Sequence, residues 1–179
     1  SIRIPASFAG IYGIKPTFGR VPMYPASPYG TLSHTGPMTR TVQDAALMLT
    51  VIAEPDARDW YGLPYSRVDY TRFLEANVRG LKIGFSDTLG LDVTVDPEVA
   101  DAVSSAAKQF AELGAVTEAI RINWPVSPRD IFLVHFAAGA ATLLSMLPNE
   151  QRDKIEPTLK AMATEGDKLD VLSVKKAEL

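Results

Sequence analysis

The feature that most constrains the fold is a strand, a helix and a second strand in close succession. LKIGF at 81–85 is predicted to be a buried strand, and AVTEAIRI at 115–122 is predicted to be the next one. Between them, Asp96 is a candidate N-cap with Pro97 in the first helical turn, and Gly114 ends the helix. The helix carries one apolar stripe, formed by Val99, Val103, Ala106, Phe110 and Leu113.

A strand–helix–strand unit of this length indicates a right-handed crossover between two parallel strands. Parallel sheets are covered by helices on both faces, because the crossover helices pack there. The sequence therefore predicts an α/β fold with a mixed, partly parallel sheet and helices on both faces.

The residues before this unit predict ordered loops, one short strand and one helix. GIYGIKP is a strand candidate that Pro16 ends. A helix is predicted from Thr41, its candidate N-cap, to Pro55. We expect an ion pair between Arg40 and Asp44, four residues apart. The buried face of this helix is predicted to consist of Ala45, Met48, Leu49 and Ile52.

The last third predicts helices. The helix expected over 129–147 is apolar nearly all round, which is typical of a helix covered on several sides. Its AAGAA segment allows another helix to approach closely. Pro148 and Asn149 are predicted to break it, and a more polar helix with Pro157 at its start or at a kink follows.

Composition excludes several classes of protein. The chain has 179 residues, 46% of them apolar, which is typical of one globular domain. Its 18 basic and 21 acidic residues give a net charge of −3, which does not favour nucleic acid or an anionic membrane as a partner. Cysteine is absent, and no apolar run approaches the ~20 residues that span a bilayer. A cytoplasmic protein is the expectation.

The sequence offers no metal or cofactor motif. Its only histidines are His34, in a turn, where a bond to backbone is expected, and His135, which is expected to lie in a helix core. Zinc spacings, phosphate-binding glycine patterns and paired carboxylates are not found. Lys15 is the only lysine near Ser1 in sequence, and the intervening strand makes it a poor candidate base. We expect neither a metal nor a cofactor.

The first 22 residues carry the most specific signal. SIRIPASFAGIYGIKPTFGRVP resembles the second half of the amidase signature, in which serine, arginine, proline, glycine and lysine positions recur at fixed spacing. Ala9 stands where that family often has cysteine. Two later segments are also similar to the family: HTGPMTRTVQDAALML, and the strand–helix–strand unit that begins with RGLKIGFSD. The resemblance therefore extends to about residue 122.

The resemblance implies a nucleophile and a mechanism. Ser1 matches the family's acyl-accepting serine, which acts with a lysine and with a second serine that has a cis peptide bond. The implied activity is hydrolysis of a non-peptide amide bond through an acyl-enzyme, with a small-molecule amide as substrate. Arg3 is expected to pair with a carboxylate and brace the signature loop.

The resemblance also implies that 1–179 is a central piece of a larger amidase domain. We expect one domain, with the signature half at 1–22, the βαβ unit at 81–122 and a helical part at 127–179. In the family the lysine and the cis serine precede the nucleophile, so the isolated chain is expected to be inactive. Its uncovered apolar surface, notably on the 129–147 helix, predicts self-association or a homo-oligomer.

Three other interpretations remain open. The chain could be the amidase-type subunit of a tRNA-dependent amidotransferase, which needs a partner protein and tRNA. It could be a scaffold domain that kept the fold and lost the chemistry. An N-terminal nucleophile hydrolase, with the α-amine of Ser1 as base, is disfavoured by the parallel βαβ unit.

Overall fold

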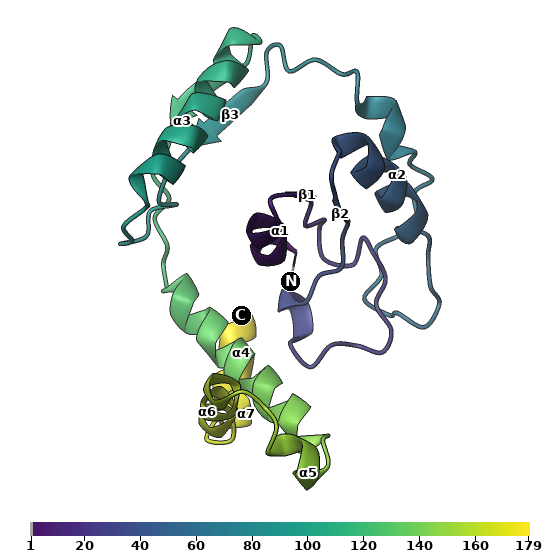
Figure 1. Ribbon diagram of the computed structural model, residues 1–179, viewed down its shortest axis with the longest axis vertical. Coiled ribbons are helices and arrows are strands. Elements are labelled where there is room, and N and C mark those ends of the chain that lie inside the picture. Colours follow the sequence, from purple (N-terminus) through teal and green to yellow (C-terminus); the bar gives the residue numbers. More distant parts are fainter. Residues whose placement is uncertain (1) are drawn as a thin grey trace. The chain divides into compact units, whose positions relative to one another are not determined.

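The computed structural model describes residues 2–179, which form two compact units (Figure 1). The first unit consists of the residues up to Leu74 together with Arg129–Leu179, and the second is Glu75–Pro128. The single-domain organisation over 1–179 stays a prediction.

The first unit begins with a short helix that the sequence did not suggest. Helix α1 spans Arg3–Ala9 and ends at Gly10, whose φ of 62° places it in the left-handed region. Strand β1 (Tyr12–Gly13) then pairs antiparallel with β2 (Met38–Thr39). The predicted strand in GIYGIKP is therefore confirmed, although only two of its residues pair.

Helix α2 (Val42–Ile52) follows as predicted, because Thr41 caps it by accepting a hydrogen bond from the Asp44 N–H at 3.1 Å. Its buried residues are Ala45, Ala46 and Leu49, so the face is shifted relative to the predicted one. The ion pair predicted between Arg40 and Asp44 is absent from the described residues. Arg40 precedes the N-cap, so helical spacing does not apply to it.

Two 3₁₀ turns complete the N-terminal part of this unit. They are η1 (Gly30–Leu32) and η2 (Tyr70–Phe73). The amide N–H of Tyr70 donates to the hydroxyl of Thr50 at 3.1 Å, which ties η2 to α2. The loop that leaves the end of α2 is therefore attached to α2 again at its far end, through this hydrogen bond.

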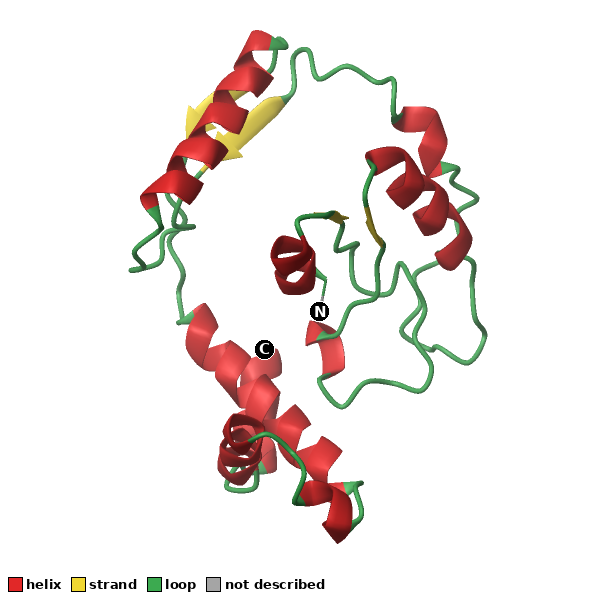
Figure 2. Cartoon of the chain, viewed as in Figure 1, coloured by secondary structure: helices red, strands yellow, loops and turns green. Residues whose placement is uncertain are grey.

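The second unit is the predicted βαβ unit. Strands β3 (Lys82–Phe85) and β4 (Val116–Ala119) pair in parallel, with Lys82 opposite Val116 and Phe85 opposite Ala119. Helix α3 (Pro97–Glu112) begins at its predicted cap, Asp96, and lies along the two strands (Figure 2). The parallel crossover is therefore confirmed.

Burial in this unit differs from the prediction. Ile83 and Phe85 are only half-buried, so the prediction of a buried strand is wrong for the described chain. The larger members of the predicted stripe on α3 are exposed: Val99, Val103, Phe110 and Leu113. Two strands are too narrow a sheet to cover a 16-residue helix.

The C-terminal part of the first unit is helical, as predicted. It consists of α4 (Pro128–Ser145), α5 (Asn149–Arg152), α6 (Pro157–Gly166) and α7 (Val171–Glu178). Pro157 is the first residue of α6, so it starts that helix rather than kinking it.

The AAGAA segment of α4 permits the close approach that the sequence predicted. A Cβ added at Gly166 of α6 would collide with the backbone oxygen of Ala137 and lie 2.8 Å from the Ala141 Cβ. A Cβ added at Gly139 would collide with the ring of Tyr29, whose centroid lies 4.9 Å from that of Phe136. Small residues thus bring both α6 and the N-terminal part against α4.

The α/β class is confirmed: the molecule is rich in helix, and the described strands form one antiparallel and one parallel pair (Figure 2). No helix within residues 2–179 combines the length and apolar character needed to cross a membrane.

Candidate active site

The candidate nucleophile, Ser1, lies outside the described residues, so its role stays a prediction. The first residue described is its neighbour Ile2, the N-cap residue of α1. Ile2 is only 5% exposed, whereas Arg3 and Ile4, which follow it, are exposed. The side chain next to the candidate nucleophile is therefore anchored in the protein interior.

Two glycines make room for Ile2. A Cβ added at Gly36 would lie 2.7 Å from the Ile2 Cδ1, and one added at Gly13 would lie 3.2 Å from the Ile2 Cγ2. The same Cβ at Gly13 would lie 2.7 Å from the Cβ of Ala6 in α1. We call Gly13, Gly36 and Ala6 the Ile2 socket.

The Ile2 socket is held by backbone pairing. Gly13 lies opposite Met38 in the β1–β2 ladder, and the Ile14 N–H donates to the Pro37 carbonyl at 3.2 Å. Pro37 is itself fully buried. The two glycines are therefore brought together from positions 23 residues apart in sequence by the paired strands.

The cations of the signature segment form no ion pair within the described residues. Lys15 Nζ donates to the carbonyl of Pro16 at 3.4 Å, and Arg20 donates to the hydroxyl of Ser66 at 3.3 Å. Arg3 is exposed and makes no ion pair within residues 2–179. The bracing carboxylate predicted for Arg3 is therefore not found in this part of the chain.

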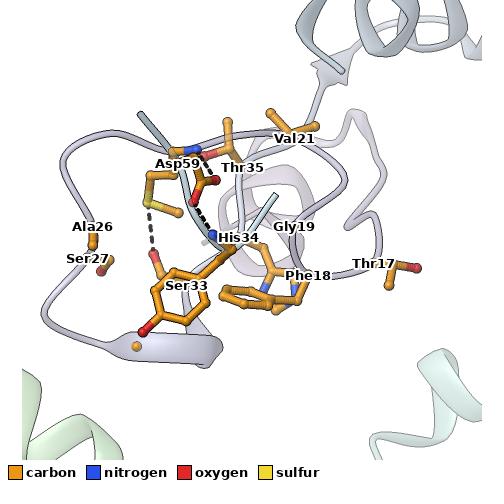
Figure 3. Close-up of a pocket in the computed structure, with 13 residues that line it drawn as sticks. Thr17, Phe18, Gly19, Val21, Ala26, Ser27, Ser33, His34, Thr35 and Asp59 are labelled. Atoms are coloured by element: carbon orange, nitrogen blue, oxygen red, sulfur yellow. Dashed lines mark hydrogen bonds between the residues drawn. The ribbon is translucent and has the colours of Figure 1, made fainter. Parts of the chain in front are cut away.

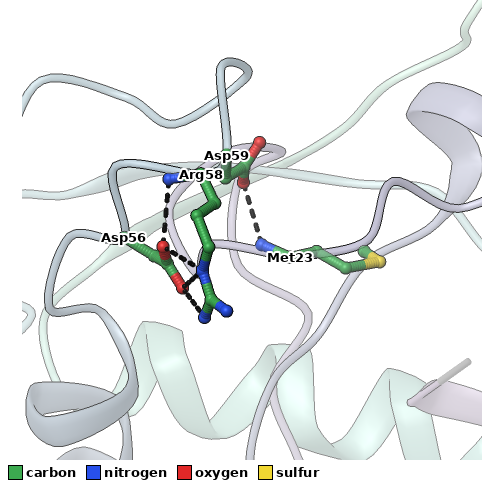
Figure 4. Close-up of polar contacts among 4 residues, drawn as sticks. All are labelled: Met23, Asp56, Arg58 and Asp59. Carbon is green, nitrogen blue, oxygen red and sulfur yellow. Dashed lines mark hydrogen bonds and ion pairs between the residues drawn. The ribbon is translucent and has the colours of Figure 1, made fainter.

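Asp59 joins the signature loop to the loop after α2 (Figure 4). One carboxylate oxygen accepts from the Met23 N–H at 2.8 Å, and the other accepts from the Tyr61 N–H at 2.9 Å. The Leu63 N–H donates to the Gly19 carbonyl at 2.8 Å. Gly19 has a φ of 78°, and a Cβ there would collide with the Tyr61 carbonyl, so only glycine fits.

Asp59 was not singled out from the sequence. The available signal was the local pattern DARDWYG, since aspartate often accepts from a backbone N–H two residues later. That pattern accounts for the bond to Tyr61. The bond to Met23 joins residues 36 apart, so no local pattern could reveal it.

Asp56 and Arg58 form an exposed ion pair beside this junction, 2.6 Å apart (Figure 4). Hydrogen bonds from the Arg58 side chain and from its backbone N–H lower the pKa of Asp56 to about 2. The Arg58 guanidinium also lies 4.8 Å from the centroid of the Tyr24 ring. Within the described residues neither side chain forms a further ion pair.

A small pocket of about 80 Å³ opens beside the junction (Figure 3). Its aromatic wall includes Phe18, His34 and Tyr61, with the Phe18 centroid 5.6 Å from His34 and 5.7 Å from Tyr61. His34 Nδ1 lies 3.1 Å from the Leu32 carbonyl, which confirms the predicted bond to backbone. The hydroxyl of Ser33 donates to the Met23 sulfur at 3.8 Å.

His135, the second histidine, is half-buried in α4. Its Nε2 lies 3.1 Å from the carbonyl of Ala177 in α7, which makes it a packing residue, as predicted. Across residues 2–179 no group of three or more histidine and carboxylate side chains is arranged to hold a metal ion.

Comparison with known proteins identifies the family. A family model described as Amidase matches residues 1–174. An acylamidase from Rhodococcus erythropolis is 34% identical over 181 residues, an alignment that covers 99% of this chain and 38% of the relative. A glutamyl-tRNA(Gln) amidotransferase subunit from Myxococcus xanthus is 39% identical over 151 residues, covering 84% of this chain and 29% of the relative.

Solved structures agree with these matches. A bacterial aryl acylamidase of the amidase signature family covers 99% of this chain with a TM-score of 0.84 and 31% identity. The structure of 6-aminohexanoate cyclic dimer hydrolase with its substrate has a TM-score of 0.81 at 23% identity, which shows the fold.

The chain spans 24% to 38% of the length of the curated relatives that it matches. The match nevertheless includes the signature segment, α2 and the βαβ unit. On this evidence the chain belongs to the amidase family.

Proposed function

We propose that the protein containing this chain hydrolyses a non-peptide amide bond, with Ser1 as the nucleophile. The observation that carries the proposal is the signature segment at 1–22, which fits the family at its serine, arginine, proline, glycine and lysine positions. The Ile2 socket supports it, because it anchors the residue bonded to Ser1.

The proposed reaction has two steps. The Ser1 Oγ attacks the amide carbonyl, its proton passes to the leaving nitrogen, and the C–N bond breaks to give an ester and ammonia or an amine. Water then attacks the ester, which releases a carboxylic acid and restores the hydroxyl of Ser1. The resemblance assigns the proton transfers to a lysine and a cis serine that precede Ser1 in family members.

The substrate we propose is a small-molecule amide. The acylamidase and the aryl acylamidase both align with 99% of this chain, which favours this substrate class.

A second candidate is the amidase-type subunit of a tRNA-dependent amidotransferase. Its support is the identity to glutamyl-tRNA(Gln) amidotransferase subunits, which reaches 44% over the 116 residues aligned with the protein from Nitrosococcus oceani. Both candidates use the same serine chemistry, and they differ in whether a partner protein and tRNA are needed.

Two further properties belong to this proposal. We place the protein in the cytoplasm. The chain has no cysteine, so its stability does not depend on disulfides that the reducing cytoplasm would break. Self-association of the 179-residue chain is supported by exposed apolar side chains on α3 and α4, among them Phe110 and Phe132.

The test is amide hydrolysis by the full-length protein and by its Ser1→Ala variant. The wild type is expected to release amine from simple aryl and alkyl amides, and Ser1→Ala is expected to lose at least ~10³-fold in kcat. Turnover of glutamine that requires a partner protein would instead support the amidotransferase candidate. Unchanged turnover by Ser1→Ala would reject both.

A further inference from the structure

The buried side chain nearest to the candidate nucleophile belongs to the residue that is bonded to it. Along residues 2–5, Ile2 alone is buried, while Arg3 and Ile4 are exposed and Pro5 is half-buried. The position of the chain at this point is therefore set by how Ile2 sits in its socket, rather than by the exposed side chains that follow.

Both branches of the Ile2 side chain lie against glycines of the Ile2 socket. Gly36 faces the Cδ1 branch and Gly13 faces the Cγ2 branch, and each glycine is too close for a methyl group. The socket is rigid on the other side as well, because a Cβ at Gly36 would also lie 2.7 Å from the Pro16 ring and would collide with the Ile14 carbonyl. A side chain held on two sides by backbone has little freedom to shift.

We propose that Ile2 is a positioning residue for the hydroxyl of Ser1. The proposal rests on the proposed function, in which Ser1 Oγ attacks an amide carbonyl. Ile2 touches neither substrate nor the reacting atoms. Its proposed role is to fix the backbone of Ile2, to which Ser1 is bonded, and so to limit how the Ser1 oxygen can approach the carbonyl carbon. A displacement of about 1 Å at a reacting group can cost ~10²-fold in rate.

The prediction is a graded loss of kcat at constant KM in the full-length protein. Ile2→Ala empties both sides of the socket and is expected to lower kcat by ~10–100-fold. Ile2→Val keeps the Cγ2 branch and loses only Cδ1, so a smaller loss of about threefold is expected. KM is expected to stay unchanged, because the proposed role of Ile2 acts through Ser1 and not through contact with the substrate.

Reactivity of the serine gives a second, substrate-independent measurement. With an alkyl fluorophosphonate the Ser1 Oγ–P bond forms, the P–F bond breaks, and fluoride leaves together with the hydroxyl proton. The rate constant for this labelling is expected to fall in the order wild type, Ile2→Val, Ile2→Ala. Ser1→Ala is expected to take up no label.

Leu49→Ala is the matched control for lost stability. Leu49 is buried to the same degree as Ile2, 5% exposed, but lies in α2. Leu49 is not one of the residues that form the Ile2 socket, so the variant removes core contacts outside it. Below its unfolding temperature, its kcat and labelling rate are expected to match those of the wild type.

The outcomes separate the two proposals. Labelling and turnover that survive in Ser1→Ala would overturn the proposed function. Loss of both in Ser1→Ala, with Ile2→Ala behaving like Leu49→Ala, would overturn the positioning role alone. If Ile2→Ala does not fold, Ile2→Val decides: a kcat equal to that of the wild type rejects the role, and a loss at unchanged KM supports it.

Discussion

The N-terminal region, residues 2–52, and the βαβ unit, Glu75–Pro128, are both recognisable in the sequence but are packed very differently. The N-terminal region buries the following residues: Ile2, Ala6, Pro16, Val21, Pro37, Ala45, Ala46 and Leu49. In the βαβ unit the one buried apolar residue among those described is Ala115. A clear pattern of secondary structure therefore does not guarantee a closed core.

The difference has a physical cause. In the N-terminal region, glycine and alanine let α1 and the β1–β2 ladder approach within contact distance, so a few small elements exclude water. In the βαβ unit, α3 is a long helix whose apolar stripe has only two short strands beneath it. The N-terminal region closes on itself, and the βαβ unit presents an apolar surface.

The largest expected effect contrasts two apolar truncations in the 179-residue chain. Leu49→Ala in α2 is expected to lower the free energy of unfolding by about 2–5 kcal/mol, because it leaves a cavity in a packed core. Phe110→Ala in α3 is expected to cost about 1 kcal/mol, because the ring is already 40% exposed.

Urea unfolding of both variants measures the contrast, with linear extrapolation to water. Equal losses of unfolding free energy in the two variants would show that the apolar stripe on α3 is covered in solution, for example by a second copy of the chain. In that case the difference between the two regions would not hold at working concentration.

A second contrast concerns two glycines. Gly36→Ala is expected to cost about 1–3 kcal/mol, because its new methyl group meets the Ile14 backbone and the Pro16 ring, which cannot yield. Gly84→Ala in β3 is expected to cost less than about 1 kcal/mol, because its methyl group meets only side-chain atoms of Ile120.

Thermal unfolding monitored by circular dichroism compares the two variants with the wild type. A larger loss of thermal stability in Gly84→Ala than in Gly36→Ala would contradict the inference that the N-terminal region is packed more rigidly than the βαβ unit.

The smallest expected effect is a pH dependence at Asp56. Because Arg58 lowers the pKa of Asp56 in the folded state to about 2, from an ordinary 3.8, the carboxylate stabilises the fold above pH 4. That contribution is lost as the pH falls from about 4 to about 2. The stability difference between wild type and Asp56→Asn is therefore expected to shrink over this range.

Unfolding curves at several pH values between 2 and 6 measure this difference. Asp92→Asn is the control in the βαβ unit, since Asp92 takes part in no ion pair within the described residues. A stability difference at Asp56 that stays constant down to pH 2 would rule out the role given to Arg58.

Helix starts and the crossover could be predicted because their causes are local. Thr41 and Asp96 each cap a helix within three residues of themselves, and Pro157 fixes the first turn of α6. The parallel pairing of β3 with β4 follows from the chirality and length of the connection.

Helix α1 was not predicted because its local signals are weak. It has seven residues, its N-cap, Ile2, offers no side-chain acceptor, and Pro5 lies inside it. It is stabilised instead by contacts with Gly13 in β1, which a local pattern does not contain.

The candidate site could be recognised only in part. The HTGP turn suggested the backbone bond of His34, which the structure confirms, while the nucleophile role that the signature implies for Ser1 stays a prediction. The socket around Ile2 and the link from Asp59 to Met23 depend on residues that the fold brings together from distant positions. Periodicity and capping contain no information about such pairs.

The junction at Asp59 has a consequence for how this chain can be varied. Its two hydrogen bonds go to main-chain N–H groups, so they do not depend on which side chains stand at positions 23 and 61. Both positions line the pocket, together with Phe18 and His34. A library that varies positions 23 and 61 among all residues except proline, while keeping Asp59 and Gly19, can therefore reshape the pocket wall without loosening the loop that carries it.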